Sequence, residues 1–276
     1  MTTRPADLPD FQSPPVTEVV LGVQFNSVER FFSPHLGRVW EKFKSDFPHI
    51  EEHPVIQPSF ETFGPHPQMQ AIGLQLVTTA EMPRVFFVNN DRTQLLQVQK
   101  DRFLHNWRKV EAGAGYPRFE RMLETFESGF LTFVDVVAAE NLGSVTPNQC
   151  EVTYINQITV PENGNVYAVI EQLFSQHTEK LVLGDLGPPE DFRFLLRYVI
   201  RDESNTPAGR LLVSAEPARR ADGTTIVQLT LTARGKPSTS DIGGVVKFLE
   251  RGRLHMVHAF ADLTSPAMHR QWERTI

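Results

Sequence analysis

The chain has 276 residues, with 27 Lys and Arg against 33 Asp and Glu, which gives a formal net charge of −6. Its 40% hydrophobic and 22% charged residues are ordinary for a globular protein, so the composition excludes a wholly disordered chain. The acidic balance also excludes a protein that mainly coats nucleic acid, because such a protein presents a basic face to the phosphates.

The first half of the chain predicts a strand, a helix, three strands and a second helix. Residues 1–15 are expected to form a flexible lead, because several prolines oppose helix formation there. Beyond this lead, alternating apolar residues predict strands, and apolar residues three and four apart predict helices. In chain order the predicted elements are a strand over 16–25, a helix over 31–47, an irregular connection over 48–67, strands over 70–79, 84–89 and 94–104, and a long helix that begins at Pro117.

The second half repeats this order of elements after a loop over residues 141–148. It predicts a strand over 150–160, a short helix over 165–174, strands over 192–201, 210–216 and 225–233, and a closing helix that begins near Asp241.

The matched order of the two halves predicts the fold class. We expect an α+β fold in which two pseudo-repeated halves, 16–140 and 149–276, form one largely antiparallel sheet with helices packed on it. The halves share little residue identity, so the repeat is one of element order. Two separate α+β domains joined near Gly143 are the alternative.

The cysteine content and the hydropathy pattern indicate where the protein works. Cys150 is the only cysteine, which excludes an intrachain disulfide and a zinc site built from cysteines. The start of the chain lacks the apolar stretch of a secretion signal, and no uncharged apolar run approaches the roughly 18 residues of a membrane span. We therefore expect a protein of the reducing cytoplasm that has no membrane partner.

The sequence contains none of the common motifs for phosphate binding, zinc proteolysis or a serine nucleophile. The best candidate for a metal site is the closing helix, where His255, His258 and Asp262 are spaced to share one face. Such sites on a single helix are uncommon, and a hydrogen-bonded helix surface explains the three residues as well. We therefore predict no metal and no cofactor, and we assign no catalytic residue.

Two predicted strands carry a concentration of polar and aromatic residues. Guanidinium and amide groups can hold a carboxylate or a peptide backbone, and an amide within a strand either pins a loop or contacts a ligand. The alternative is that the aromatic residues belong to the core and the arginines are solvated. The candidate binding residues are Arg102, Asn106, Trp107 and Arg108 on one strand and Tyr154 and Asn156 on another.

Several segments, taken together and in order, resemble a known group of proteins. The segments are Pro14-Pro-Val-Thr-Glu-Val-Val20, Asp101-Arg-Phe-x-x-Asn-Trp-Arg108, Tyr116-Pro117, Glu151-Val-Thr-Tyr-Ile-Asn156 and the closing Leu254-His255 … Phe260 … Leu263-Thr-Ser-Pro266 … His269 … Trp272. They resemble a sporadically distributed bacterial family of uncharacterised cytoplasmic proteins of about this length. The overall pattern is also similar to the peptide-binding proteins of crocagin-type pathways, which tailor ribosomally made peptides (RiPPs).

This resemblance implies a protein that binds a precursor peptide, without catalysis or by assisting cyclisation, beside the tailoring enzymes of the same pathway. We expect the peptide to lie extended in a groove between the two candidate strands, with an affinity on the order of micromolar. We also expect a homodimer, because a symmetry mate commonly covers exposed sheet edges. The alternatives are an enzyme with an unrecognised site and a protein-binding partner in a defence or toxin-immunity system.

Overall fold

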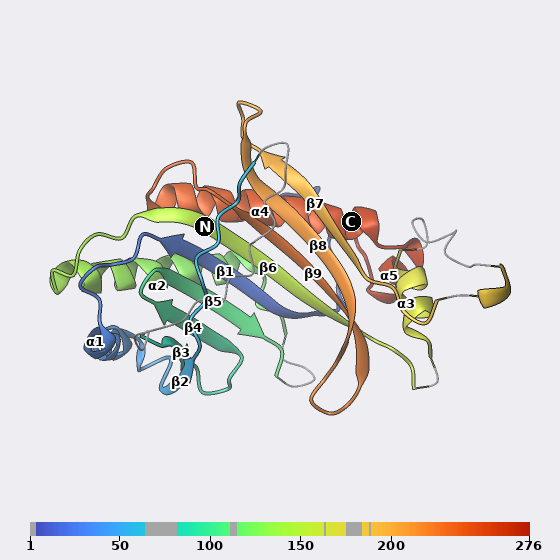
Figure 1. Ribbon diagram of the computed structural model, residues 1–276, viewed down its shortest axis with the longest axis horizontal. Helices are drawn as coiled ribbons and strands as arrows, with labels where there is room; N and C mark the ends of the chain where they lie inside the picture. Colours follow the sequence, from blue (N-terminus) through green and yellow to red (C-terminus); the bar gives the residue numbers. More distant parts are fainter. Residues whose placement is uncertain (1–3, 64–81, 111–114, 163, 175–183, 188) are drawn as a thin grey trace.

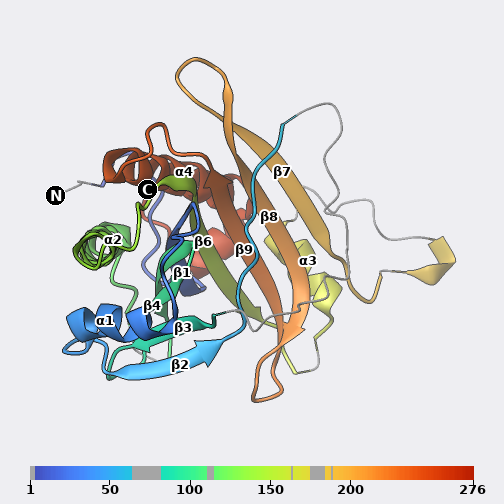
Figure 2. The same ribbon diagram turned by 60° about the vertical axis from the view of Figure 1, so that its left-hand side comes forward.

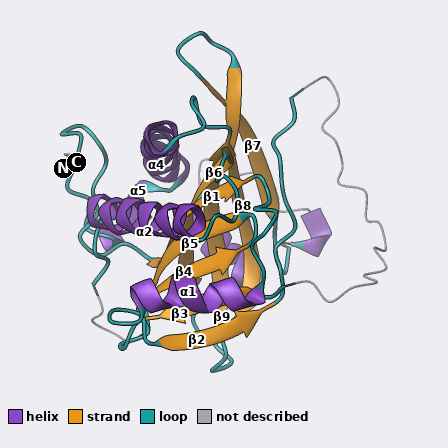
Figure 3. Cartoon of the chain, turned by 90° about the vertical axis from the view of Figure 1, so that its left-hand side faces the viewer, coloured by secondary structure: helices purple, strands orange, loops and turns teal. Residues whose placement is uncertain are grey.

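The computed structural model describes residues 4–63, 82–110, 115–162, 164–174, 184–187 and 189–276. The strands in these ranges form one antiparallel sheet in the order β2-β3-β4-β5-β1-β6-β9-β8-β7, and the long helices lie along one face of it (Figure 1). Figure 3 shows α1, α2 and α4 together on that side of the sheet. The expected α+β architecture is confirmed.

The elements follow the predicted order, with one more strand in the first half than in the second. The first half consists of β1 (Val16–Phe25), α1 (Ser33–Phe43), β2 (His49–His53), β3 (Arg84–Val88), β4 (Gln94–Gln99), β5 (Arg102–Arg108) and α2 (Phe119–Ala139). The second half consists of β6 (Pro147–Thr159), α3 (Val166–Leu173), a 3₁₀ turn (Gly184–Leu186), β7 (Phe194–Arg201), β8 (Pro207–Arg219), β9 (Thr225–Gly235), α4 (Ile242–Leu263) and α5 (Pro266–Gln271). None of the described helices combines the length and the apolarity that crossing a bilayer requires.

The pairing of β1 with β6 at the centre of the sheet joins the two halves into a single sheet. In each half, the last strand of that half lies next to the central strand, and the earlier strands follow toward the edge of the sheet. The order β1-β5-β4-β3 of the first half therefore matches the order β6-β9-β8-β7 of the second. Two separate domains joined near Gly143 are excluded by this continuous sheet.

Two predictions in the first half are wrong in detail. Residues 94–104 are not one strand: β4 and β5 meet at a tight turn at Lys100-Asp101, which contains neither the glycine nor the proline that marks such turns in a sequence. Residues 49–53 are not irregular, because β2 pairs with β3 through the main chain at the sheet edge. The strand predicted over 70–79 lies outside the described residues.

The described part of the N-terminal lead, residues 4–15, is packed against the C-terminal helices, and so the expectation of a flexible lead is wrong for it. Leu8 is fully buried, and the ring of Phe11 meets the ring of Phe260 edge-on at 5.2 Å. Phe11 also forms a β-bridge with Arg274. The prolines prevent helix here, but the two apolar side chains still find partners in the core.

A glycine in the middle of each long helix allows the helix to approach the sheet closely. A Cβ atom at Gly129 of α2 would lie 3.1 Å from the ring of Phe103 on β5. A Cβ atom at Gly252 of α4 would lie 2.8 Å from Val152 on β6 and 3.0 Å from Ala233 on β9. Because side chains in a packed sheet face have little room to move, these glycines set the distance between helix and sheet.

Gly252→Ala should therefore destabilise the protein, although alanine favours a helix over glycine by about 1 kcal/mol. We expect overpacking to exceed that gain and to lower the free energy of unfolding by roughly 1–3 kcal/mol. Gly37 in α1 is the matched control, because no atom outside the adjacent residues and its own helix backbone lies within 4 Å of its Cβ position. Gly37→Ala should raise the stability by about 0.5–1 kcal/mol. Urea unfolding of both variants is the measurement, and a stabilised Gly252→Ala protein would contradict the close packing.

One histidine lies in the interior, between the sheet and α2. His105 on β5 has no exposed surface, and its Nδ1 lies 3.2 Å from the carbonyl oxygen of Met122. Its Nε2 lies 3.0 Å from the side-chain amide of Gln94. Burial disfavours the imidazolium and lowers the pKa of His105 to about 4, although the hydrogen bond to Met122 acts in the other direction.

This lowered pKa predicts a loss of stability in mild acid. Unfolding restores the pKa of His105 to about 6.5, so between pH 6.5 and 4 the unfolded chain binds a proton that the folded chain does not bind. The free energy of unfolding should fall as the pH drops through this range, by up to about 3 kcal/mol for this residue. The pH profile of a His105→Gln variant, subtracted from that of the wild type, isolates the effect. Parallel profiles would contradict the assignment.

Candidate functional site

The predicted groove between β5 and β6 does not exist, because β1 lies between these strands and the register places their candidate residues on different faces. Trp107 pairs with Val19, and Val19 pairs with Tyr154. Directly paired side chains lie on the same face of a sheet, so both aromatic side chains point toward the helices. Asn156, two residues beyond Tyr154, does the same.

The other three predicted residues point to the face that the helices leave open. Arg102, Asn106 and Arg108 occupy alternate positions on β5 and so share that face. Asn106 is buried there between two polar neighbours, since its Oδ1 accepts from Gln97 at 2.8 Å and its Nδ2 donates to Glu18 at 2.6 Å. The six candidate residues thus form an open-face set and a helix-side set.

An extended stretch of chain, residues 55–63, runs across the strands on the open face (Figures 1 and 2). We name it the crossing segment. It forms no helix or strand, and none of its residues is buried. Through its contacts it reaches from β4 at one end to β8 at the other. It therefore occupies the open face without belonging to the sheet.

A row of polar side chains lies beneath the crossing segment. The strand register aligns them, because Gln99, Arg102, Gln24 and Gln149 pair in succession across β4, β5, β1 and β6. A second succession of pairs runs from Glu151 on β6 through β9 to β8. We name this the polar row, and its members are Gln24, Gln99, Arg102, Gln149, Glu151, Arg210 and Arg234.

At the β4 end, the polar row holds the main chain of the crossing segment. The Gln99 side chain accepts from the N–H of Ile56 and donates to its carbonyl, both at 2.9 Å. Arg102 donates to the following carbonyl oxygen at 3.2 Å. Gln24 accepts from the N–H of Ser59 at 2.9 Å. Every residue type except proline, which lacks the N–H, has both of these main-chain groups, so this end depends little on the side chains of the segment.

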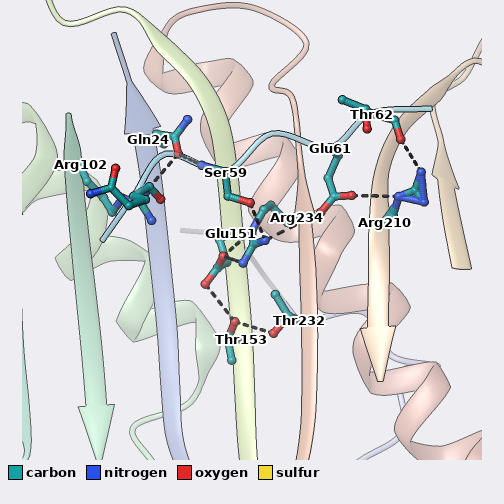
Figure 4. A network of polar contacts seen from close by, with 11 residues as sticks. Gln24, Ser59, Glu61, Thr62, Arg102, Glu151, Thr153, Arg210, Thr232 and Arg234 are labelled. Atoms are coloured by element: carbon teal, nitrogen blue, oxygen red, sulfur yellow. Dashed lines mark hydrogen bonds and ion pairs between the residues drawn. The ribbon is translucent and has the colours of Figure 1, made fainter. Parts of the chain in front are cut away.

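At the β8 end, arginines hold a carboxylate and an aromatic ring. Arg210 Nε donates to Glu61 at 2.9 Å, and the Arg234 guanidinium lies 3.9 Å from the same carboxylate (Figure 4). Arg234 also pairs with Glu151 on β6, with Nε donating at 2.6 Å. The Arg210 guanidinium lies 4.9 Å from the centre of the Phe63 ring. This end of the row therefore does depend on side-chain type.

Four members of the polar row, Gln24, Gln99, Arg102 and Gln149, are buried, which is unusual for charged and amide side chains. Burial lowers the pKa of Arg102, while Asp101 and Glu151 act to raise it. A cavity of about 20 Å³ lies between the row and the crossing segment, lined by Arg102 and Gln149 among others. Among the described residues, Arg102 Nε and Gln149 Oε1 have no hydrogen-bond partner. The crossing segment thus satisfies the row incompletely.

Two members of the helix-side set, Tyr154 and Asn156, line a cavity between β6, α2 and α4, whereas Trp107 lines a neighbouring hollow beside Lys109 and Tyr116. The hydroxyl oxygens of Tyr116 and Tyr154 are 3.1 Å apart, and burial raises the pKa of both groups. Nearby, Arg253 pairs with Glu120 at 2.8 Å. The cavity measures about 70 Å³ and its walls are mostly apolar, so it is too small for an extended peptide. Asn156 donates to a carbonyl of the neighbouring strand at 3.1 Å, so its amide pins the sheet itself.

The remaining candidate groups are the histidines and the aspartate of α4 and the single cysteine. Among the described residues, no three side chains of His, Cys, Asp or Glu come together as metal ligands, and this includes His255, His258 and Asp262. All three are exposed on α4. Cys150 is buried, and burial raises the pKa of its thiol, so the thiolate does not form near pH 7.

Arg102 is the one member of the polar row that the sequence predicted. The other six members are polar residues spread over five strands, β1, β4, β6, β8 and β9, and these strands were recognised by their apolar residues. Only the cross-strand register aligns them, and no local spacing carries that information. The sequence did predict an irregular connection over the residues of the crossing segment, but not that it lies on the sheet.

A scan against protein-family models finds no matching family, and a search among curated proteins finds no similar sequence.

Proposed function

We propose that the protein binds an extended peptide on the open face of its sheet. In this role it is an accessory protein that holds a ribosomally made precursor peptide in the cytoplasm during natural-product biosynthesis, as in crocagin-like pathways, and presents it to tailoring enzymes or assists its cyclisation. The observation that supports the proposal is the set of hydrogen bonds from the polar row to the main chain of the crossing segment.

An unfolded peptide carries main-chain N–H and C=O groups that have no partner within the peptide. A peptide that leaves water must find partners for its N–H and C=O groups. Gln24, Gln99 and Arg102 offer a donor or acceptor to such groups, as their contacts with the crossing segment illustrate. They project from neighbouring strands of one sheet, so their spacing is fixed before a ligand arrives, which lowers the entropic cost of binding.

The resemblance to peptide-binding proteins agrees with this use of the open face. The list of candidate peptide-contacting residues becomes shorter. The open-face set, Arg102, Asn106 and Arg108, remains a candidate for contact with the peptide. The helix-side set, Trp107, Tyr154 and Asn156, does not remain one, because these side chains point away from the open face, toward the helices.

We also propose a homodimer formed through the outer strand β7. This strand ends the sheet and exposes three large apolar side chains, Leu195, Tyr198 and Val199, which are 52%, 46% and 44% exposed. An exposed apolar edge strand is a surface that a second copy covers by strand pairing.

Site-directed cross-linking tests the peptide site directly. Cys150 is buried with a raised thiol pKa, so an introduced cysteine is the reactive one in the chain. Thr230→Cys places a benzophenone label on the open face of β9. The probe is a synthetic precursor peptide of a crocagin-type pathway. We expect cross-linking that excess unlabelled peptide suppresses, and an affinity on the order of micromolar by calorimetry.

His258→Cys is the matched control, because His258 is exposed on α4, on the other side of the sheet. It should give no cross-link. Equal cross-linking of both proteins, or cross-linking of the control alone, would contradict binding on the open face.

A further inference from the structure

We infer that the crossing segment is an internal occupant of the peptide site, and that the site selects ligands with the same chemistry. The selected ligand is an extended chain in which a carboxylate side chain is followed two residues later by an aromatic ring. This inference rests on the proposed function, because it concerns the same surface. It adds the specificity that main-chain hydrogen bonds cannot supply.

The charges of the polar row favour an acidic ligand, although the whole chain is acidic. The row contains three arginines and one glutamate. Asp101 lies beside Arg102 and acts on its charge, and Glu151 pairs with Arg234. Among the described residues, Arg210 forms no ion pair with a carboxylate of the sheet, and Glu61 of the crossing segment pairs with it.

The position of the carboxylate is well defined. Arg210 and Glu61 are only 15% and 12% exposed at their side chains, so water screens their attraction less than it screens a surface pair. Arg210 also donates to the carbonyl of Thr62 and lies over the ring of Phe63. One arginine thus contacts three consecutive residues of the segment, which fixes the spacing between the acid and the aromatic ring.

The crossing segment is held in a way that another chain can replace. Its two aromatic rings, Phe60 and Phe63, remain 54% and 38% exposed, so apolar burial contributes little to holding it. Arg102 Nε and Gln149 Oε1 lack partners among the described residues. A ligand that supplies an acceptor and a donor at these atoms gains hydrogen bonds that the segment does not make.

A charge reversal within the segment tests the inference while every residue of the polar row stays intact. Glu61→Lys sets two like charges against each other at Arg210 and should release the segment. The probe is a synthetic peptide with the sequence of residues 54–63, Pro-Val-Ile-Gln-Pro-Ser-Phe-Glu-Thr-Phe. We expect it to bind the Glu61→Lys protein at least about tenfold more tightly than the wild type, and to lose about tenfold when its Glu is replaced by Gln.

Two further variants keep the test decisive. Glu216→Lys makes the same charge change on the same strand and face as Arg210, outside the polar row, and should bind the peptide as the wild type does. Glu61→Gln removes the charge without repulsion, and it should give a smaller gain in affinity. If thermal unfolding shows that the Glu61→Lys protein does not fold, the Glu61→Gln protein takes its place in the binding measurement.

The outcomes separate this inference from the proposed function. Equal affinities for the Glu and Gln peptides would overturn the selection of a carboxylate. If neither peptide binds while the precursor peptide still cross-links at position 230, the segment is a fixed part of the fold and the inference is wrong. If cross-linking at position 230 is also absent, it is the proposed function that fails.

Discussion

The antiparallel pairing of β1 with β6 is the interaction on which the rest of the structure depends. It joins the two halves of the chain into one sheet, and its register, with Val20 opposite Thr153, decides which side chains share a face. A slip of one residue would move every side chain of one strand to the other face. In the observed register, Gln24 and Glu151 meet the open face while Val152 lies under the helices.

The two faces of the sheet therefore differ: helices cover one, and the other carries the polar row. On the helix side, α2 and α4 pack against the sheet at glycines, and the Tyr116–Tyr154 pair and Arg253 line the small cavity there. The open side carries a row of buried amides and guanidinium groups that need partners, because unpaired polar groups are costly once they are removed from water. The crossing segment supplies most of these partners. A surface of this kind favours an extended polypeptide over a compact ligand.

Local patterns in the sequence predicted most elements of the fold but not the site. Alternation within β1, β6 and β9, and the three-and-four spacing in α2 and α4, depend on residues close in sequence, so they were recognised. The turn between β4 and β5 was missed because Lys100-Asp101 contains neither glycine nor proline. The groove was misplaced because β1 was not known to separate Trp107 from Tyr154. Pairing between distant strands is set by the whole sheet, and one sequence does not contain it in readable form.

Hydrogen exchange on the intact protein, with and without the precursor peptide, tests most directly whether a peptide takes the open face from the crossing segment. In the free protein the amides of Ile56 and Ser59 donate to Gln99 and Gln24, so they should exchange slowly. Bound peptide should accelerate exchange across residues 55–63 and leave α2 and α4 unchanged. Unchanged exchange over residues 55–63, with new protection confined to residues 116–119 and 253–260 around the helix-side cavity, would contradict this account.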